Sequence, residues 1–83
     1  MNRYELEVRA QCPANKKVLD VYQVVVVSRA MIEVEKLWSY FKQFEDEAIF
    51  QEELTRGAAL AFPGAEVTTT GWHSCVKTTC TAP

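Results

Sequence analysis

The chain has 83 residues, a net charge of −2 and a sequence pI near 5.3, so it is small and mildly acidic. A chain of this length supports one hydrophobic core, and we expect a single α+β domain over residues 1–83. The hydrophobic fraction of 48% excludes a disordered chain, and the aliphatic run Val24–Val27 is far shorter than the roughly 20 residues that cross a bilayer. No basic run is longer than Lys16-Lys17, which argues against direct binding of nucleic acid.

The amino-terminal segment and the cysteines indicate the compartment. The first ten residues, MNRYELEVRA, alternate charged and apolar side chains and lack the apolar stretch of a signal peptide. Three cysteines cannot all pair within one chain, and their spacing matches no disulfide framework. We therefore expect a cytoplasmic protein with reduced thiols, no membrane segment and no cofactor.

Two strands are predicted in the first third of the chain. Apolar and charged side chains alternate over Tyr4–Gln11, which is typical of a strand with one buried face and one wet face. A polar connection with Pro13 and Asn15 follows, and the β-branched run from about Val18 to Ser28 predicts a second strand, apolar on both faces near its end. We expect this strand in the middle of a sheet, where a charge at Val25 should prevent folding.

A helical pattern begins after Ser28, which is a candidate N-cap. Apolar residues then recur at steps of three and four, as in an amphipathic helix. The apolar positions are Val34, Leu37, Phe41, Phe44 and Ala48. The stripe continues over residues 50–61, with a possible end at Arg56-Gly57. We expect two helices with a bend near residues 45–47, and not one long helix.

The last quarter of the chain is predicted to return to extended structure. The Pro-Gly pair within Phe62–Glu66 predicts a turn. The segment that follows is rich in threonine and valine, and Gly71 or Ser74 can divide it into two short strands. The element order is β-β-α-(α)-β-β, so the expected fold is a two-layer α+β sandwich: a four-stranded, mainly antiparallel sheet with one or two helices on one face.

This element order, together with the Cys12-Pro13 step, resembles the tunnelling-fold proteins. Members of that superfamily bind purines or pterins between subunits, and some of its reductases contain a cysteine-proline step. The resemblance covers the topology and these two residues, and no residue of this chain is matched to the carboxylate that anchors the ligand. It implies an oligomer with a site at the subunit interface, for which Cys12, His73 and Glu66 are candidates.

Four side chains of zinc-binding types are Cys12, His73, Cys75 and Cys80. Structural zinc sites present close ligand pairs about two to four residues apart, whereas here only His73 and Cys75 are close. In an unbroken strand these two share a face and Cys80 lies on the other. We therefore expect no metal, with Cys12 and Cys75 as small buried side chains and His73 on a polar face. A cysteine nucleophile activated by His73 is disfavoured for the same geometric reason, and no catalytic residue is assigned.

The segment FEDEAIFQEEL carries five carboxylates and no basic residue. They are Glu45, Asp46, Glu47, Glu52 and Glu53. On one helix surface such carboxylates repel one another, which suggests a docking patch for a protein with a basic surface; a solvated helix face is the alternative. Trp38 and Tyr40 join this candidate surface, because they diverge by about 200° on a helix and one of them should lie near the surface.

The first functional hypothesis is a small non-enzymatic interaction or regulatory protein that binds a basic protein partner through an acidic helix. Inhibitors encoded by phages and mobile elements are of this kind. The alternative is an oligomeric small-molecule binder or enzyme, with a purine- or pterin-like ligand at the subunit interface. Self-association as a homodimer would cover the apolar surface that one sheet-helix layer leaves exposed.

Overall fold

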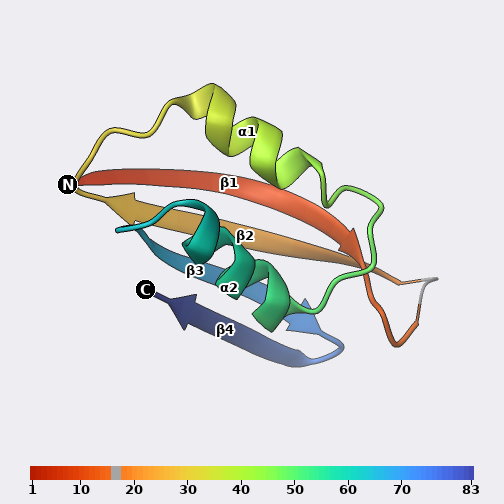
Figure 1. Ribbon diagram of the computed structural model, residues 1–83. Coiled ribbons are helices and arrows are strands. Elements are labelled where there is room, and N and C mark those ends of the chain that lie inside the picture. Colours follow the sequence, from red (N-terminus) through yellow and green to blue (C-terminus); the bar gives the residue numbers. More distant parts are fainter. Residues whose placement is uncertain (16–17) are drawn as a thin grey trace.

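The computed structural model describes residues 1–15 and 18–83 and confirms the predicted α+β fold. Two strands come first, two helices follow, and two further strands end the chain (Figure 1). The elements are β1 (Asn2–Gln11), β2 (Leu19–Ser28), α1 (Val34–Lys42), α2 (Gln51–Ala61), β3 (Glu66–His73) and β4 (Val76–Ala82). Neither of these helices is long and apolar enough to span a membrane.

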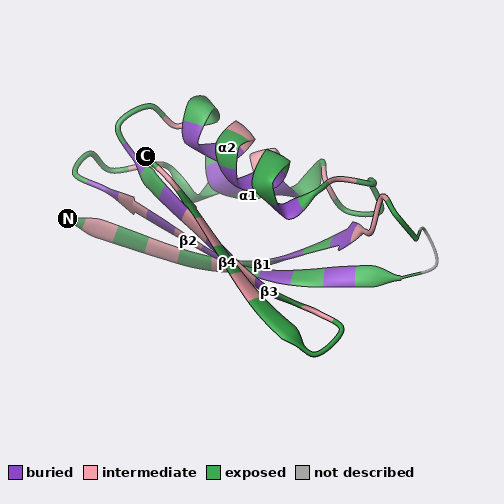
Figure 2. Ribbon diagram, turned by 90° about the horizontal axis from the view of Figure 1, so that it is seen from below, coloured by how far each residue is buried: buried purple, intermediate pink, exposed green. Residues whose placement is uncertain are grey.

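The four strands form one antiparallel sheet in the order β1-β2-β3-β4. The sheet order follows the chain order, although both helices lie between β2 and β3 in the sequence. β2 is therefore an inner strand, as predicted, and pairs with β1 over ten residues. Both helices cover the same face of the sheet, and the other face is open (Figure 2).

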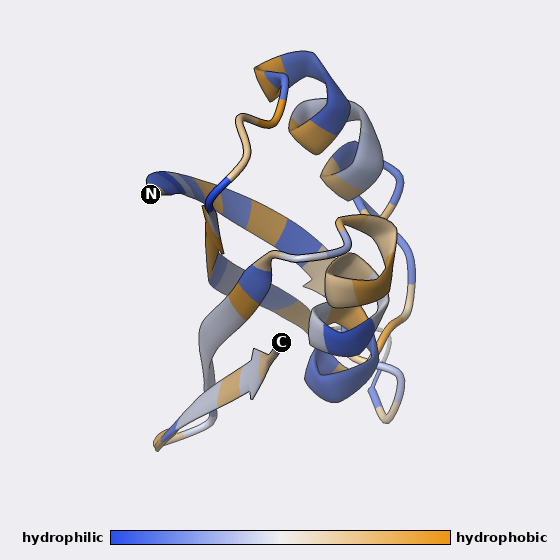
Figure 3. Ribbon diagram, turned by 60° about the vertical axis from the view of Figure 1, so that its left-hand side comes forward, coloured by the Kyte–Doolittle hydropathy of each residue, from blue (hydrophilic) through white to orange (hydrophobic). Residues whose placement is uncertain are grey.

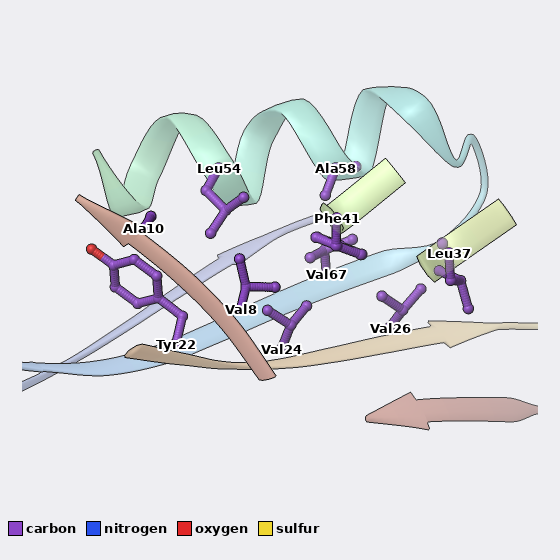
Figure 4. Packing of buried hydrophobic residues seen from close by; sticks show 12 residues of the cluster. Val8, Ala10, Tyr22, Val24, Val26, Leu37, Phe41, Leu54, Ala58 and Val67 are labelled. Carbon is purple, nitrogen blue, oxygen red and sulfur yellow. The ribbon is translucent and has the colours of Figure 1, made fainter. Parts of the chain in front are cut away.

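The core lies between this covered face and the helices. Alternate residues of each strand point toward the helices, and β1 shows the alternation as hydrophobic and hydrophilic bands (Figure 3). From the helices, Leu37, Phe41, Leu54 and Ala58 are buried against the sheet. Figure 4 shows Leu54 of α2 pointing toward the sheet. The sheet contributes Val8, Ala10, Tyr22, Val24, Val26 and Val67.

The open face of the sheet corrects one expectation. Val25 lies on this face and is half-buried, whereas its neighbours Val24 and Val26 are fully buried on the covered face. The period-2 geometry of a strand separates them, because successive side chains point to opposite faces. A carboxylate at position 25 would keep access to water, so for the single chain we now expect Val25→Asp to fold.

The helical region is divided as predicted, although two of its limits differ. Residues 43–50 separate α1 from α2, and Asp46 adopts a left-handed conformation (φ 66°) in this connection. Ser28 is not an N-cap, because β2 continues to this residue and α1 starts only at Val34. Gly57 does not end α2 either: a Cβ at this position would lie 3.2 Å from the Tyr40 hydroxyl, so glycine here permits close approach of the two helices.

The aromatic residues of α1 divide between core and surface, as expected. Trp38 is 59% exposed, whereas Tyr40 is half-buried. The ring of Tyr40 makes edge contacts with Phe41, Phe44 and Phe62 at centroid distances of 5.1 to 5.4 Å. Tyr40 therefore belongs mainly to the packing between the helices, and Trp38 is the exposed member of the pair.

Candidate functional site

The hairpin between β3 and β4 brings His73 and Cys80 to the same face of the sheet. Ser74 has a left-handed backbone (φ 59°), and the chain reverses at Ser74-Cys75. Cys75 therefore lies exposed in the turn, and the expectations that it is buried and that it shares a strand face with His73 are wrong. The unbroken strand assumed from the sequence separated His73 from Cys80, and the reversal removes that separation.

Gln51, the first residue of α2, connects the helix to both carboxy-terminal strands. Its side chain is 5% exposed. The amide nitrogen donates to the carbonyl and hydroxyl oxygens of Thr69, both at 3.1 Å, and to the carbonyl of Thr78 at 2.9 Å. Its oxygen lies 2.8 Å from Nε2 of His73. Thr55, one turn along α2, donates to the Gln51 carbonyl and contacts the Thr69 hydroxyl at 2.6 Å. Sequence reasoning missed Gln51, which has no charge and lies among glutamates.

Asp20 and Tyr22, neighbours on the covered face of β2, complete this polar cluster. The Tyr22 hydroxyl donates to Oδ2 of Asp20 at 3.2 Å, and Oδ1 of Asp20 lies 3.9 Å from Nδ1 of His73. Burial raises the pKa of Tyr22, and so do the Asp20 carboxylate and the charges of Cys12 and Cys80. Tyr22 is thus held as a neutral hydroxyl that can donate to the carboxylate. We refer to Asp20, Tyr22, Gln51 and His73 as the polar cluster.

An open pocket of about 400 Å³ lies over this cluster, between the start of α2 and the β3–β4 hairpin. We refer to it as the α2–β4 pocket. It is lined by Phe50, Gln51, Glu52, Glu53, Arg56, His73, Thr78 and Cys80. Phe50 presents an exposed ring, and Glu52 an exposed carboxylate. Burial, and next the charge of Glu52, raise the pKa of the Cys80 thiol. Cys80 is therefore held in its neutral form.

Cys12 lies at the end of β1 and is half-buried, not fully buried as expected. Its amide donates to the carbonyl of Val18 at 3.0 Å, which closes the connection between β1 and β2. Cys12 contributes to the raised pKa of Tyr22, so its sulfur lies within electrostatic range of the polar cluster. The predicted connection also contains Lys16 and Lys17, which lie outside the described residues.

Backbone hydrogen bonds hold the connection between the helices against the end of β1. The amide of Gln11 donates to the carbonyl of Glu47 at 2.9 Å, and the amide of Ile49 donates to the carbonyl of Gln11 at 3.3 Å. Because Ile49 is followed by Phe50 and α2, this link relates the start of α2 to the strand end that carries Cys12.

The five predicted carboxylates do not form one helix face. Glu45, Asp46 and Glu47 lie in the connection between the helices, whereas Glu52 and Glu53 occupy the first turn of α2. All five are exposed. The five carboxylates therefore do not all repel one another along one helix. Glu52 and Glu53 are instead favoured by the helix dipole at the amino terminus of α2. Docking of a basic protein on these residues, with Trp38 and Tyr40, stays a prediction.

The structure also divides the predicted surface between two hollows. Glu52 and Glu53 line the α2–β4 pocket, whereas Trp38 and Glu45 line a hollow of about 260 Å³ between β1 and α1. Of the five carboxylates, Glu45 thus lies at the same hollow as the exposed Trp38, whereas Glu52 and Glu53 lie at the other.

Two further features from the sequence are the candidate site residue Glu66 and the side chains of zinc-binding types. Glu66 starts β3 opposite Val27, at the other end of the strand from His73, so Glu66 and His73 of one chain do not share a site. Within residues 1–15 and 18–83, the structure contains no group of three His, Cys, Asp or Glu side chains arranged to hold a metal ion.

The chain is a two-layer α+β protein with a largely buried polar cluster and an open pocket at one end of its sheet. No protein-family model matches the chain, and no curated protein sequence matches it.

Among solved structures, the chain is similar to the archaeosine synthase QueF-Like, whose crystal structure was determined in the apo form. The TM-score is 0.82 at 21% sequence identity, and the match covers 98% of this chain and 89% of that chain. At this level of identity the similarity establishes the fold that the two proteins share.

Proposed function

We propose that this chain is a subunit of an oligomeric protein that binds a purine- or pterin-like heterocycle in the α2–β4 pocket, at a subunit interface. One observation carries the proposal: the pocket combines an exposed aromatic ring, Phe50, with an exposed carboxylate, Glu52, above a buried polar cluster. A flat ring can stack on the phenylalanine while polar edge groups bind the carboxylate. The shared fold with a protein named as an archaeosine synthase, an enzyme named for a nucleoside, supports the same ligand class.

The chemistry of Glu52 specifies which edge of a heterocycle the pocket would select. An ionised carboxylate only accepts hydrogen bonds, through two oxygens side by side. A guanine-type edge offers an N–H and an amino group next to each other, and pterins carry the same pair. Adenine instead places a ring acceptor beside its amino group, which the carboxylate repels. We therefore propose a ligand with paired N–H donors.

We place the pocket at a subunit interface because a single chain leaves apolar surface exposed around it. The pocket is open on one side, and Phe50 is 53% exposed. The open face of the sheet carries the exposed side chains of Leu19, Val21 and Trp72, and β1 and β4 are edge strands. Apolar side chains of this kind on an open sheet are normally covered by a partner, and a second copy would also narrow the pocket.

Replacing Glu52 by glutamine should weaken guanosine binding by roughly 10- to 100-fold, because a hydrogen bond to a charged group contributes about 1.5–3 kcal/mol. Isothermal titration calorimetry with guanosine, neopterin and adenosine measures this effect. Glu47→Gln is the matched control, since it makes the same charge change outside the pocket. The proposal is wrong if neither guanosine nor neopterin binds the wild type, or if the two variants weaken binding equally.

We also propose that Cys12, and not Cys80, is the reactive thiol of the site. The thiolate is the nucleophilic form, and burial together with Glu52 holds Cys80 as a neutral thiol. Cys12 is half-buried at the strand end that the helix connection joins to the start of α2. Cys12 does not line the α2–β4 pocket, so the assignment requires a ligand that extends from the pocket over the polar cluster toward the end of β1.

Alkylation with iodoacetamide, followed by peptide mass analysis, tests this assignment. We expect Cys12 to react at least several-fold faster than Cys80, and bound guanosine to slow the reaction of Cys12. Cys75, exposed in the hairpin turn, is the internal control that guanosine should leave unprotected. Faster labelling of Cys80 than of Cys12 would contradict the assignment.

A further inference from the structure

The orientation of the Gln51 amide is determined by its surroundings. Its nitrogen lies within 3.1 Å of the carbonyl oxygens of Thr69 and Thr78. Carbonyl oxygens only accept hydrogen bonds, so the NH2 group and not the oxygen of Gln51 must face them. The amide oxygen is therefore directed at His73, whose Nε2 lies 2.8 Å away. An amide oxygen also only accepts, so Nε2 of His73 must carry a hydrogen.

This constraint determines what the other ring nitrogen can do. In a neutral imidazole with the hydrogen on Nε2, Nδ1 is an acceptor. Nδ1 lies 3.9 Å from Oδ1 of Asp20, beyond the roughly 3.2 Å limit of a hydrogen bond. The other carboxylate oxygen of Asp20 already accepts from Tyr22, which burial and the Asp20 charge keep protonated. In the neutral form of His73, Nδ1 and Oδ1 are thus two acceptor atoms 3.9 Å apart with no proton between them. His73 lines the pocket, whereas Asp20 is buried and does not line it.

We infer that Gln51 is a positioning residue that fixes the neutral His73 imidazole as the Nε2–H tautomer, so that Nδ1 and the Asp20 carboxylate together bind one amino group of a ligand. An amino nitrogen about 2.9 Å from each acceptor fits between atoms 3.9 Å apart. A carboxylate beside a neutral imidazole favours a cationic amino group over a neutral one. The inference rests on the proposed function in that His73 lines the same pocket.

The geometry also predicts what the loss of Gln51 does. Without the amide oxygen, no acceptor among the described residues hydrogen-bonds Nε2, whereas the Asp20 carboxylate lies on the side of Nδ1. At 3.9 Å the Asp20 carboxylate is too far away for a hydrogen bond, but its charge still attracts a proton on Nδ1 electrostatically. The proton should therefore move to Nδ1, where it would occupy the position of the ligand amino group.

Nitrogen-15 NMR of histidine-labelled protein tests the tautomer directly. His73 is the single histidine of the chain, so every imidazole signal belongs to it. The spectra are recorded near pH 8.5, well above the ordinary imidazole pKa of about 6.5. In the wild type we expect a protonated Nε2 and an unprotonated Nδ1.

In Gln51→Met, which keeps the length of the side chain, we expect the proton predominantly on Nδ1. Asp20→Asn added to this variant should return the proton to Nε2. Gln23→Met, on the open face of the sheet, is the matched control and should resemble the wild type.

Methylammonium chloride is the probe for the ligand class. In the wild type it should shift the Nδ1 resonance in a saturable way, and sodium acetate at equal ionic strength should not. Asp20→Asn and Gln51→Met should each weaken this effect at least tenfold. A wild-type Nδ1–H tautomer would overturn the positioning role, and this result does not depend on whether Gln51→Met folds. An unchanged tautomer in folded Gln51→Met would overturn it as well. An unresponsive Nδ1 would overturn the amino-group assignment, while guanosine binding through Glu52 tests the proposed function separately.

Discussion

Replacing Val26 by aspartate should abolish folding, whereas the same replacement at Val25 should leave a folded protein. Val26 is 0% exposed between β2 and the helices, and a carboxylate there loses its hydration without gaining a partner. That penalty is several kcal/mol against a total stability of about 5–15 kcal/mol for a small domain. Val25 lies on the open face, where its cross-strand neighbour Glu5 adds a like-charge cost of only about 0.2–1 kcal/mol.

Soluble expression and thermal melting by circular dichroism measure this contrast, and the adjacent positions serve as controls for each other. Sedimentation of Val25→Asp adds a second result: if the open face is an interface between copies, this variant should be folded but monomeric. A cooperative melt for Val26→Asp would mean that the helices do not cover this face of β2.

Leu54→Ala should destabilise the protein by about 2–5 kcal/mol, because deletion of a fully buried side chain leaves a cavity as well as a lost transfer free energy. Leu54 is 0% exposed and points from α2 onto the sheet (Figure 4). Leu60 is on the same helix but 74% exposed, so Leu60→Ala should change stability by no more than about 0.5 kcal/mol.

Urea denaturation gives the free energy of unfolding of both variants, and the m-value of each variant is measured in the same experiment. The two variants make the same chemical change in the same helix, so helix propensity affects them similarly and burial alone separates them. Equal losses would show that α2 does not pack on the sheet through Leu54. A large loss only for Leu60→Ala would reverse the face of the helix that is buried.

Local patterns in the sequence were sufficient for the fold. The alternation in Tyr4–Gln11, the β-branched run around Val24–Val27 and the Pro-Gly turn after Phe62 each reflect a backbone geometry that neighbouring residues impose, whatever the rest of the chain does. The division into two helices near residues 45–47 was also predicted. The limits of the helices were less accurate, because Gly57 is accommodated by the approach of Tyr40 from another helix.

Only the tertiary structure could identify the polar cluster. Gln51 contacts residues 18 to 27 positions away, and His73 meets an aspartate on a different strand. No spacing rule relates such positions, because their proximity depends on the order of strands in the sheet and on where α2 begins. The hairpin turn at Ser74 also reversed the assignment of Cys75 and Cys80, since one left-handed residue changes which side chains share a face. Local sequence patterns thus account for the two layers, whereas the packing of α2 across β3 and β4 sets which side chains meet at the pocket.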